Sequence, residues 1–487
     1  MLWGSSKLTR KLISRTLCAT DTRKTMPLPK KQLGVFALTM ITVAGIYNIR
    51  SLPIMAKYGF SSTFFFILAA LVFFIPSAMV CAELAASFPK RGGTYAWVNQ
   101  AFGARSGFLA VWLEWINTVV AFPMNLTFIS TTVSYIFMPA LAHNKLYMII
   151  MTLSIFWLTT WINLYGVKVS SWVSSIGLIF GTLLPTVLII LLGLIWLFKG
   201  LPTHIQFNQT SFFPSITPHS AVLLVSVILG YAGMQVAAFH IHEAKNPQRD
   251  FPRAILMASF IIIIASVFGT LAIAIIVPNH SIGIVTGIMQ ALTVFLSRFH
   301  LAWLVPVFAC LIIVGSAASL NTWVIAPCKG LHAAVHDGHL PRLLKRTNRH
   351  NVPHVILILQ ALIATLLTCV FLFMPTVASS YWLLTALSAI MTFIMDILLF
   401  SAVIRLRYSE PDTPRPYRIP GGLSVVWLVA GAGIIASIAG IILGFMPPSQ
   451  LKTGSSTVYQ SFLIAGLVIL CLPAIFIHIR NTKRAAS

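Results

Sequence analysis

The sequence predicts an all-α polytopic membrane protein with twelve transmembrane helices. Of its 487 residues, 58% are hydrophobic and only 9% are charged, and the mean hydropathy is +0.90. A soluble domain carries roughly 25% charged residues, so this chain lacks the polar surface that water requires. Twelve long apolar runs and a regular alternation of basic loops complete the prediction, which excludes a soluble enzyme.

Crossing a bilayer takes about 20 apolar residues in a helix, and this length defines the predicted spans. A further run at 285–296 has helical spacing but is too short to span, so we expect it to lie on the outer surface. The twelve spans are 33–56, 60–86, 105–138, 146–166, 170–199, 219–242, 254–278, 301–333, 354–375, 381–407, 422–446 and 458–479.

Basic residues alternate between the two sides of the membrane. Loops on one side hold 27 of the 33 Lys and Arg residues, the opposite loops hold five, and Arg50 lies inside the first span. The positive-inside rule then places both termini in the cytoplasm, in agreement with an even number of spans. Because the net charge of +24 is divided among loops and not clustered on one soluble face, no nucleic-acid partner is expected.

The chain divides into five predicted segments. Residues 1–25 are basic and rich in Ser and Thr, and we interpret them as a disordered or spurious extension. No metal, cofactor or disulfide framework is expected, because the six cysteines are scattered without a C-x-x-C pair. The segments are a cytoplasmic stretch at 1–32, two five-helix repeats at 33–199 and 219–407, two more helices at 422–479 and a cytoplasmic tail at 480–487.

Two spans that lie five helices apart are interrupted internally. The first contains TVAGIYNIRSLP at 42–53, and the sixth contains LGYAGMQ at 229–235. Glycine lets a backbone leave the helix and proline cannot continue one, while unpaired backbone at membrane depth must line a cavity or be buried. Paired interruptions indicate the substrate site of an inverted-repeat transporter. Glycines that allow close helix packing are the alternative.

Several stretches resemble the amino acid, polyamine and organocation permease superfamily, and within it the bacterial glutamate/GABA antiporters. They are FPKRGGTYAW at 88–97, HEAKNPQRDFP at 242–252, NVP at 351–353, IPGG at 419–422 and MPP at 446–448. The resemblance runs from the first span to the twelfth. It implies a LeuT-like core of five plus five inverted helices, two further helices, and amino acid exchange by alternating access.

The chain departs from the antiporters at positions that bear on the substrate. It keeps their first-span tyrosine as Tyr47, but Gln235 and Ser319 align with two glutamates, and Thr392 and Asp396 align with two tyrosines. We expect an amino acid antiporter, with an acidic amino acid and its decarboxylation product as one exchange pair. The alternative is a proton-coupled amino acid symporter with a neutral or basic substrate.

The interrupted spans offer partners for both charges of an amino acid. Amides around Ile46 to Asn48 favour the carboxylate, and carbonyls from Leu229 to Ala232 can accept from the ammonium. For each aromatic residue, ordinary packing is the alternative, and Ser316 and Thr322 are further polar groups in the eighth span. The predicted substrate-binding residues are Gly45, Ile46, Tyr47, Asn48, Trp115, Asn117, Gly230, Tyr231, Ala232, Gly233, Gln235, Ser319 and Thr392.

Three charged residues lie within predicted spans: Arg50, Glu114 and Asp396. A charge in the bilayer costs on the order of 2.5 to 3.5 kcal/mol, so each should be paired or face a water-filled cavity. Arg50 and Asp396 are predicted to form an extracellular gate pair. A static ion pair is an alternative, as is an Arg50 that receives a substrate carboxylate while Asp396 carries a proton. Glu114 could set the cavity charge, carry a proton or pair with Arg50.

Charges near the cytoplasmic surface are assigned other roles. Glu83 and Glu243 are expected to pair with Lys90, Arg91 or Lys245 and to shape an inner gate. Sodium coupling through Ser316 and Ser319 is a weaker alternative. Histidines near the inner ends of the spans could gate transport by pH or could be ordinary solvated residues. These histidines are His240, His242, His332, His336, His339, His350 and His354.

The other function classes that fit a membrane protein are disfavoured. No soluble signalling domain is attached for a receptor, no H-E-x-x-H or G-x-S-x-G motif is present for a hydrolase, and no filter-like loop is present for a channel. We therefore expect a multi-pass transporter of the bacterial inner membrane. Its partners would be small amino acids and the lipid bilayer, and the oligomeric state is left open.

Overall fold

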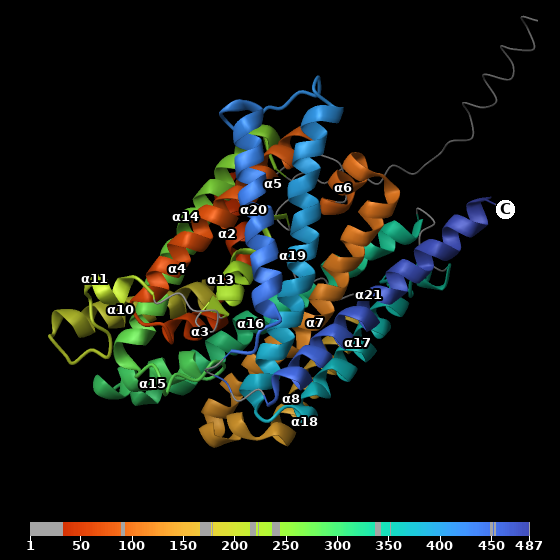
Figure 1. Ribbon diagram of the computed structural model, residues 1–487. Coiled ribbons are helices and arrows are strands. Elements are labelled where there is room, and N and C mark those ends of the chain that lie inside the picture. The colour runs from red at the N-terminus through yellow and green to blue at the C-terminus, as the bar shows by residue number, and fades with distance from the viewer. Residues whose placement is uncertain are drawn as a thin grey trace, which may run out of the picture.

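The computed structural model is a bundle of helices (Figure 1). Within the part of the chain that it describes, the extended contact is a single bridge between Leu33 and Ala244, which ties the start of the first span to the segment before α14. The described residues are 33–88, 93–165, 177, 179–214, 221–222, 224–235, 244–336, 342–350, 352–448, 451 and 454–486.

Ten helices in these residues are long and apolar enough to cross a membrane, and a bent pair at the first span brings the number to eleven. The all-helical membrane class is thereby confirmed. The crossing elements are α2 (Val35–Ile46) with η1 (Ile49–Ser51) and α3 (Leu52–Ala56); α4 (Ser61–Ala69) with η2 (Ala70–Phe74) and α5 (Ile75–Ser87); α7 (Ala104–Phe137); α8 (Lys145–Leu164); η4 (Ile179–Leu183) with α10 (Leu184–Phe198); α14 (Pro247–Ile276); α16 (Val305–His336); α17 (His354–Thr368) with α18 (Val370–Phe373); α19 (Val377–Ser409); α20 (Gly422–Gly444); and α21 (Ser456–Ala486).

The sixth predicted span, at 219–242, lies partly outside the described residues. Its described portion contains α13 (Leu224–Tyr231), which stops at the predicted interruption. The remaining short elements are α6 (Thr94–Phe102), η3 (Pro139–His143), α11 (Gln209–Phe212), α15 (Gly287–Arg298), η6 (Ala302–Leu304) and η7 (Arg342–Lys345).

The amphipathic helix predicted at 285–296 is present as α15, but its apolar face is not left on the surface. Ile288, Leu292 and Phe295 are fully buried, and α15 packs against α3, α10, α14 and α16. The i, i+4, i+7 spacing of these side chains forms one stripe, which the neighbouring helices cover.

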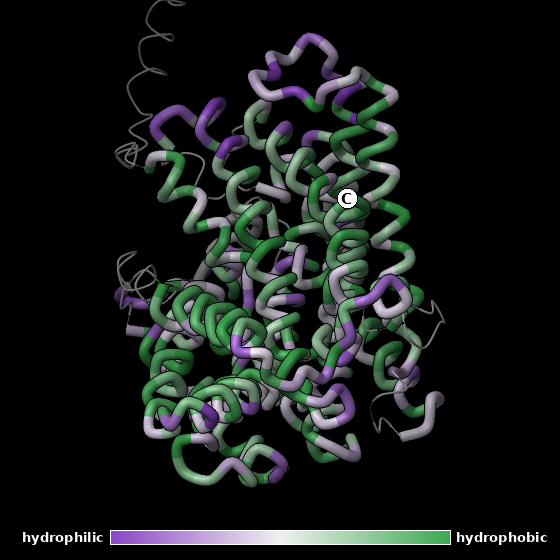
Figure 2. Tube along the Cα trace, turned by 90° about the vertical axis from the view of Figure 1, so that its left-hand side faces the viewer, coloured by the Kyte–Doolittle hydropathy of each residue, from purple (hydrophilic) through white to green (hydrophobic). Residues whose placement is uncertain are grey.

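Two long helices, α7 and α19, form the centre of the bundle. They pack against each other, α7 also contacts α16, and α19 also contacts α20. Figure 2 shows that hydrophobic segments make up the body of the bundle while hydrophilic segments gather towards its ends. On the outer face of α20, Leu428, Ile435 and Ile442 are exposed at seven-residue spacing, as expected of side chains that contact lipid.

The first span is interrupted where the sequence predicts. The backbone becomes extended at Tyr47 and Asn48, and the helix resumes at η1 because the Asn48 side chain accepts a hydrogen bond from the Arg50 amide, at 3.1 Å. Pro53 then occupies the first turn of α3, where its missing N–H costs nothing. The two halves are bent by 40°.

The end of α13 lies beside this interruption. Gly233 has a φ of +112°, a conformation that favours glycine, and a Cβ built on it would lie 3.7 Å from Ile46 Cγ1 and 3.9 Å from Gly45 O. The two predicted interruptions, far apart in the chain, are therefore adjacent in space.

Other glycines serve close helix packing. A Cβ on Gly315 of α16 would lie 2.3 Å from the Cα of Gly181 in η4, so these backbones touch directly. This contact is the packing use of glycine that the sequence left as an alternative for the interruptions.

Candidate functional site

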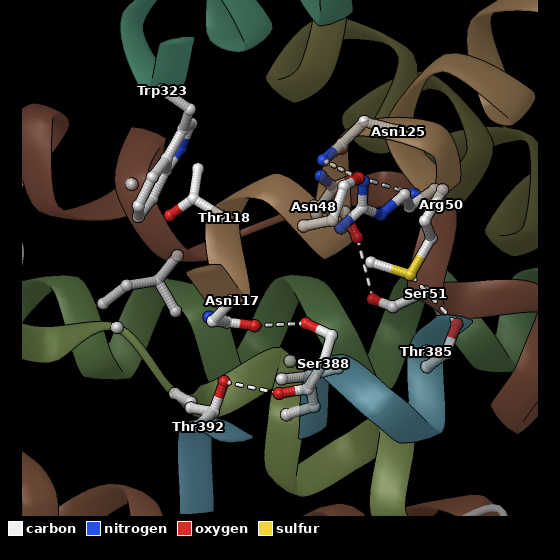
Figure 3. A pocket seen from close by; sticks show the side chains of 18 of the residues that line it. Asn48, Arg50, Ser51, Asn117, Thr118, Asn125, Trp323, Thr385, Ser388 and Thr392 are labelled. Atoms are coloured by element: carbon white, nitrogen blue, oxygen red, sulfur yellow. Dashed lines mark hydrogen bonds between the residues drawn. The ribbon is translucent and has the colours of Figure 1, made fainter. Parts of the chain in front are cut away.

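A cavity of about 160 Å³ lies in the middle of the bundle, where the interruption of the first span meets α7, α13, α16 and α19 (Figure 3). Gly45 to Asn48 contribute one wall, and Leu229, Gly230, Ala232 and Gly233 contribute another. Regular helix hydrogen bonding stops at these positions because each helix ends there. The cavity is therefore bordered by two helix ends as well as by side chains.

Most of the predicted binding residues line this cavity, so their placement agrees with the sequence analysis. Glu114 of α7 and Arg50 of η1 line it as well. The predicted substrate-binding residues found in the lining are Gly45, Ile46, Tyr47, Asn48, Asn117, Gly230, Ala232, Gly233, Gln235, Ser319 and Thr392.

Two predicted substrate-binding residues lie outside the lining of the main cavity. Trp115 is fully buried and packs against Trp112, with ring centroids 5.2 Å apart. Tyr231 stacks on Phe74 at 4.4 Å and lines a smaller cavity behind the interruption. Both aromatic residues therefore pack against neighbouring rings, as in the alternative that the sequence analysis left open.

The tyrosine shared with the antiporters is also held by packing. The Tyr47 hydroxyl is 3.1 Å from Thr186 Oγ1 of α10. Ser316 is not among the lining residues, and the side chain of Thr322 is outside the described residues.

The sequence analysis missed a polar stripe on α19. Tyr381, Thr385 and Ser388 line the cavity together with the predicted Thr392, at successive spacings of four, three and four residues. Such spacing places side chains on one helix face, so the pattern could have been found by extending from Thr392. On α7, Thr118 and Asn125 extend the face of Asn117 in the same way.

Hydrogen bonds tie α7 to α19 across the cavity (Figure 3). Ser388 donates to Asn117 Oδ1, and Thr385 Oγ1 lies 2.9 Å from the Met124 sulfur. Thr392 instead donates to the carbonyl of Ser388 at 2.9 Å. These contacts give the hydroxyl groups of Thr385, Ser388 and Thr392 hydrogen-bond partners. Polar groups of other elements also face the cavity.

Two buried polar atoms of the lining have no hydrogen-bond partner among the described residues. They are Nη1 of Arg50 and Oε1 of Gln235. One is a donor on a cation and the other is a neutral acceptor. A buried unpaired polar atom costs about 1–3 kcal/mol, so a ligand that pairs with both atoms would recover that cost.

The predicted gate pair is not formed. Arg50 and Asp396 make no ion pair with each other or with any other described residue. The ionisable side chain that faces Arg50 is Tyr381. Asp396 lies fifteen residues further along α19, roughly 22 Å in helix rise. It is fully buried, lies outside the cavity lining and faces Glu114 and Cys81. Glu114 likewise makes no ion pair with Arg50.

The carboxylate Glu83 is paired, but with other partners than those predicted. Its oxygens bond Arg407 of α19 and lie 3.5 Å from Arg415 Nε, whereas Lys90 and Arg91 are outside the described residues. The predicted histidine group also falls partly outside them, at His240, His242 and His339. Of the others, His332 contacts the carbonyl of Lys345 at 3.2 Å.

Comparison with known proteins identifies the family. A transporter of Legionella pneumophila, named as uncharacterized, is 44% identical over 90% of this chain and 95% of its own length. A glutamate/gamma-aminobutyrate antiporter of Lactococcus lactis is 30% identical over 93% of this chain and 92% of its own length. A probable agmatine/putrescine antiporter of the same species is 22% identical over 92% of this chain and 95% of its own length. The sequence pattern of the amino acid permease family matches residues 31–470, so this chain belongs to the amino acid permeases and is a membrane transporter.

Proposed function

We propose that this permease is a secondary active amino acid antiporter of the glutamate/GABA exchanger type. The observation that carries the proposal is the pair of unpartnered atoms in the cavity, Arg50 Nη1 and Gln235 Oε1. A cationic donor and a neutral acceptor are complementary to the carboxylate and the ammonium of one amino acid. The Lactococcus relatives are named as glutamate/gamma-aminobutyrate antiporters, which supports the same class of substrate.

In this proposal Arg50 binds a carboxylate of the substrate. Its guanidinium is buried at the outer half of the interrupted span, and no described acidic side chain neutralises it. A planar guanidinium can form two parallel hydrogen bonds with a carboxylate, which makes it selective for that group. Both glutamate and its decarboxylation product retain a carboxylate, so one site can exchange them.

The ammonium of the substrate binds on the other side of the cavity. Gln235 Oε1 accepts from it, together with backbone carbonyl groups at the end of α13, where the helix stops. Neutral acceptors suit an ammonium that must be released again, because a carboxylate in the same place would bind it more strongly. Gln235 and Ser319, which replace two glutamates of the antiporters, keep this part of the cavity uncharged.

The proposed architecture is twelve spans with both termini in the cytoplasm of a bacterial inner membrane. Two inverted repeats, at 33–199 and 219–407, would rock around the cavity, with 422–479 as two further helices. The adjacency of the two interruptions supports this arrangement, since repeats related by inversion bring such positions together.

The test is counterflow in proteoliposomes that contain the purified chain. Vesicles are loaded with glutamate, GABA, leucine or buffer, and entry of labelled glutamate is measured without sodium. Exchange predicts rapid entry only with glutamate or GABA inside. Equal entry into empty vesicles would contradict antiport, and no entry under any loading would remove this substrate pair.

A further inference from the structure

Glu114 and Asp396 are two buried carboxylates on α7 and α19, helices that pack against each other. Glu114 lines the cavity from α7, one turn from Asn117 and Thr118. Asp396 lies on α19 one turn beyond Thr392, which also lines the cavity. The contacts of Asn117 with Ser388 and of Met124 with Thr385 show that α7 and α19 run antiparallel, so Glu114 and Asp396 lie on the same side of the Asn117–Ser388 hydrogen bond. Asp396 is 1% exposed and Glu114 is 8% exposed, so both lie within the protein.

The surroundings of the pair contain no compensating cation among the described residues. From α5, the titratable group that faces Asp396 is the thiol of Cys81, and from α7 it is Glu114 itself. The α20 helix, packed along α19, carries no ionisable side chain. Neither carboxylate takes part in an ion pair with a described residue, and Asp396 Oδ2 has no hydrogen-bond partner.

A third buried carboxylate, that of Glu83, has cationic partners, which Glu114 and Asp396 lack among the described residues. Glu83 is as deeply buried as Asp396, yet it binds Arg407 with both oxygens, lies near Arg415 and accepts from the Ile419 amide at 2.8 Å. A buried charge that lacks such partners costs several kcal/mol. Two neighbouring carboxylates without a cation cannot both be ionised at this cost, so a proton is the partner that remains.

We propose that Glu114 and Asp396 together hold one proton, that this proton crosses the membrane inward with glutamate, and that it is released inside before the exported substrate is carried out. Water in the cavity reaches Glu114, which lines it, and Glu114 passes the proton to and from the buried Asp396. The step forms one O–H bond and breaks one, with water as donor on one side of the membrane and acceptor on the other. No other reactant is required.

This inference deepens the proposed transport function and rests on it for one of its two tests. The first test needs no substrate. Infrared spectra of the purified protein in lipid are recorded at neutral pH, and the C=O stretching band of a protonated carboxylic acid is compared between wild type and E114Q/D396N. We expect the band in wild type and its loss in the double variant. The control is D412N, which removes an exposed carboxylate and should leave the band unchanged.

Thermal unfolding of E114Q/D396N establishes that the double variant is folded, and the single variants D396N and E114Q replace it if it is not. Each single variant should remove or shift the same band. A wild-type spectrum whose carboxylic-acid band is identical in all of these variants would overturn the proton site.

The second test measures proton movement during transport. Proteoliposomes that are loaded with GABA and a pH-sensitive dye are exposed to labelled glutamate with the outside acidic or neutral. Wild type should take up more glutamate when the outside is acidic, and the interior should acidify in step with uptake. E114Q/D396N should lose this dependence on outside pH. Glutamate uptake by wild type without acidification would refute proton transfer, whereas absent uptake would refute the exchange function and leave the infrared test valid.

Discussion

The guanidinium of Arg407 donates two hydrogen bonds to the carboxylate of Glu83, with Nε 2.6 Å from Oε1 and Nη2 2.7 Å from Oε2. Both side chains are almost fully buried. The pair joins α5 to α19 near their C-terminal ends, and the Ile419 amide fixes the loop before α20 to the same carboxylate. Burial lowers the pKa of the neighbouring Arg415, and the charge of Glu83 opposes that shift. We infer that this cluster is a structural joint.

Removing Glu83 should destabilise the protein strongly. E83A leaves Arg407 as a buried cation without a partner, which typically costs about 3–5 kcal/mol. The expected result is a lower unfolding temperature in detergent. D412N, at an exposed acidic position, should unfold at the wild-type temperature.

The double variant E83M/R407M separates charge from packing in that experiment. Because it removes both charges together, it should recover much of the stability that E83A loses. If E83A and E83M/R407M were equally unstable, packing at this joint, and not the ion pair, would account for the loss.

A methyl group should not fit between α16 and η4. G315A adds a Cβ that would lie 2.3 Å from Gly181 Cα, so the two backbones must separate. Such overpacking typically costs about 1–3 kcal/mol, measured as a lower unfolding temperature. The control is G431A in α20, where a Cβ meets nothing within 4 Å and alanine is the better helix former. Equal stability of the two variants would mean that α16 and η4 separate without cost.

The sequence could predict which backbone segments meet at the cavity. Glycine and proline report directly on where a helix must end, and both interruptions lie where the residues at 45–48 and 230–233 indicate. Two polar side chains of the sixth span, Ser226 and Gln235, also line the cavity. These features are local, so a single sequence contains the information.

The level at which each charged side chain lies along the bundle could not be predicted in the same way. Arg50 and Asp396 were paired because both are charges within spans, but a charge does not reveal at which level its helix crosses its neighbour. That level depends on how α19 packs against the interrupted span, and it places Tyr381 beside Arg50. The position of Trp115 outside the cavity lining was not predictable for a related reason, because an aromatic ring is equally suited to either face of a buried helix.

Arg50 should determine affinity for the carboxylate. Replacing it with glutamine removes a charged hydrogen-bonding partner worth about 1.5–3 kcal/mol, so the KM for glutamate in counterflow should rise about 10- to 150-fold. R50K keeps the charge but loses the planar, forked geometry, and its KM should lie between those of wild type and R50Q.

The matched control for Arg50 is R298Q, which changes an exposed arginine at the end of α15. Its transport should equal that of wild type. If R50Q and R298Q had the same KM for glutamate, Arg50 would not bind the substrate, and the counterflow data with wild type would still decide whether the chain exchanges glutamate.

Gln235 should act on the other end of the substrate. Q235L replaces the unpartnered amide oxygen with a methyl group of similar size, so the ammonium loses one acceptor. A hydrogen bond to a charged group contributes about 1.5–3 kcal/mol, and the apparent affinity for glutamate and GABA should fall about 10- to 150-fold.

Glutarate, which has two carboxylates and no ammonium, provides the discriminating competitor. Its inhibition of labelled glutamate entry should be the same in Q235L and wild type, because it makes no bond to Gln235. Q209L, at an exposed position in α11, should leave all of these values unchanged. If Q235L weakened glutarate as much as GABA, Gln235 would shape the cavity as a whole and would not bind the ammonium.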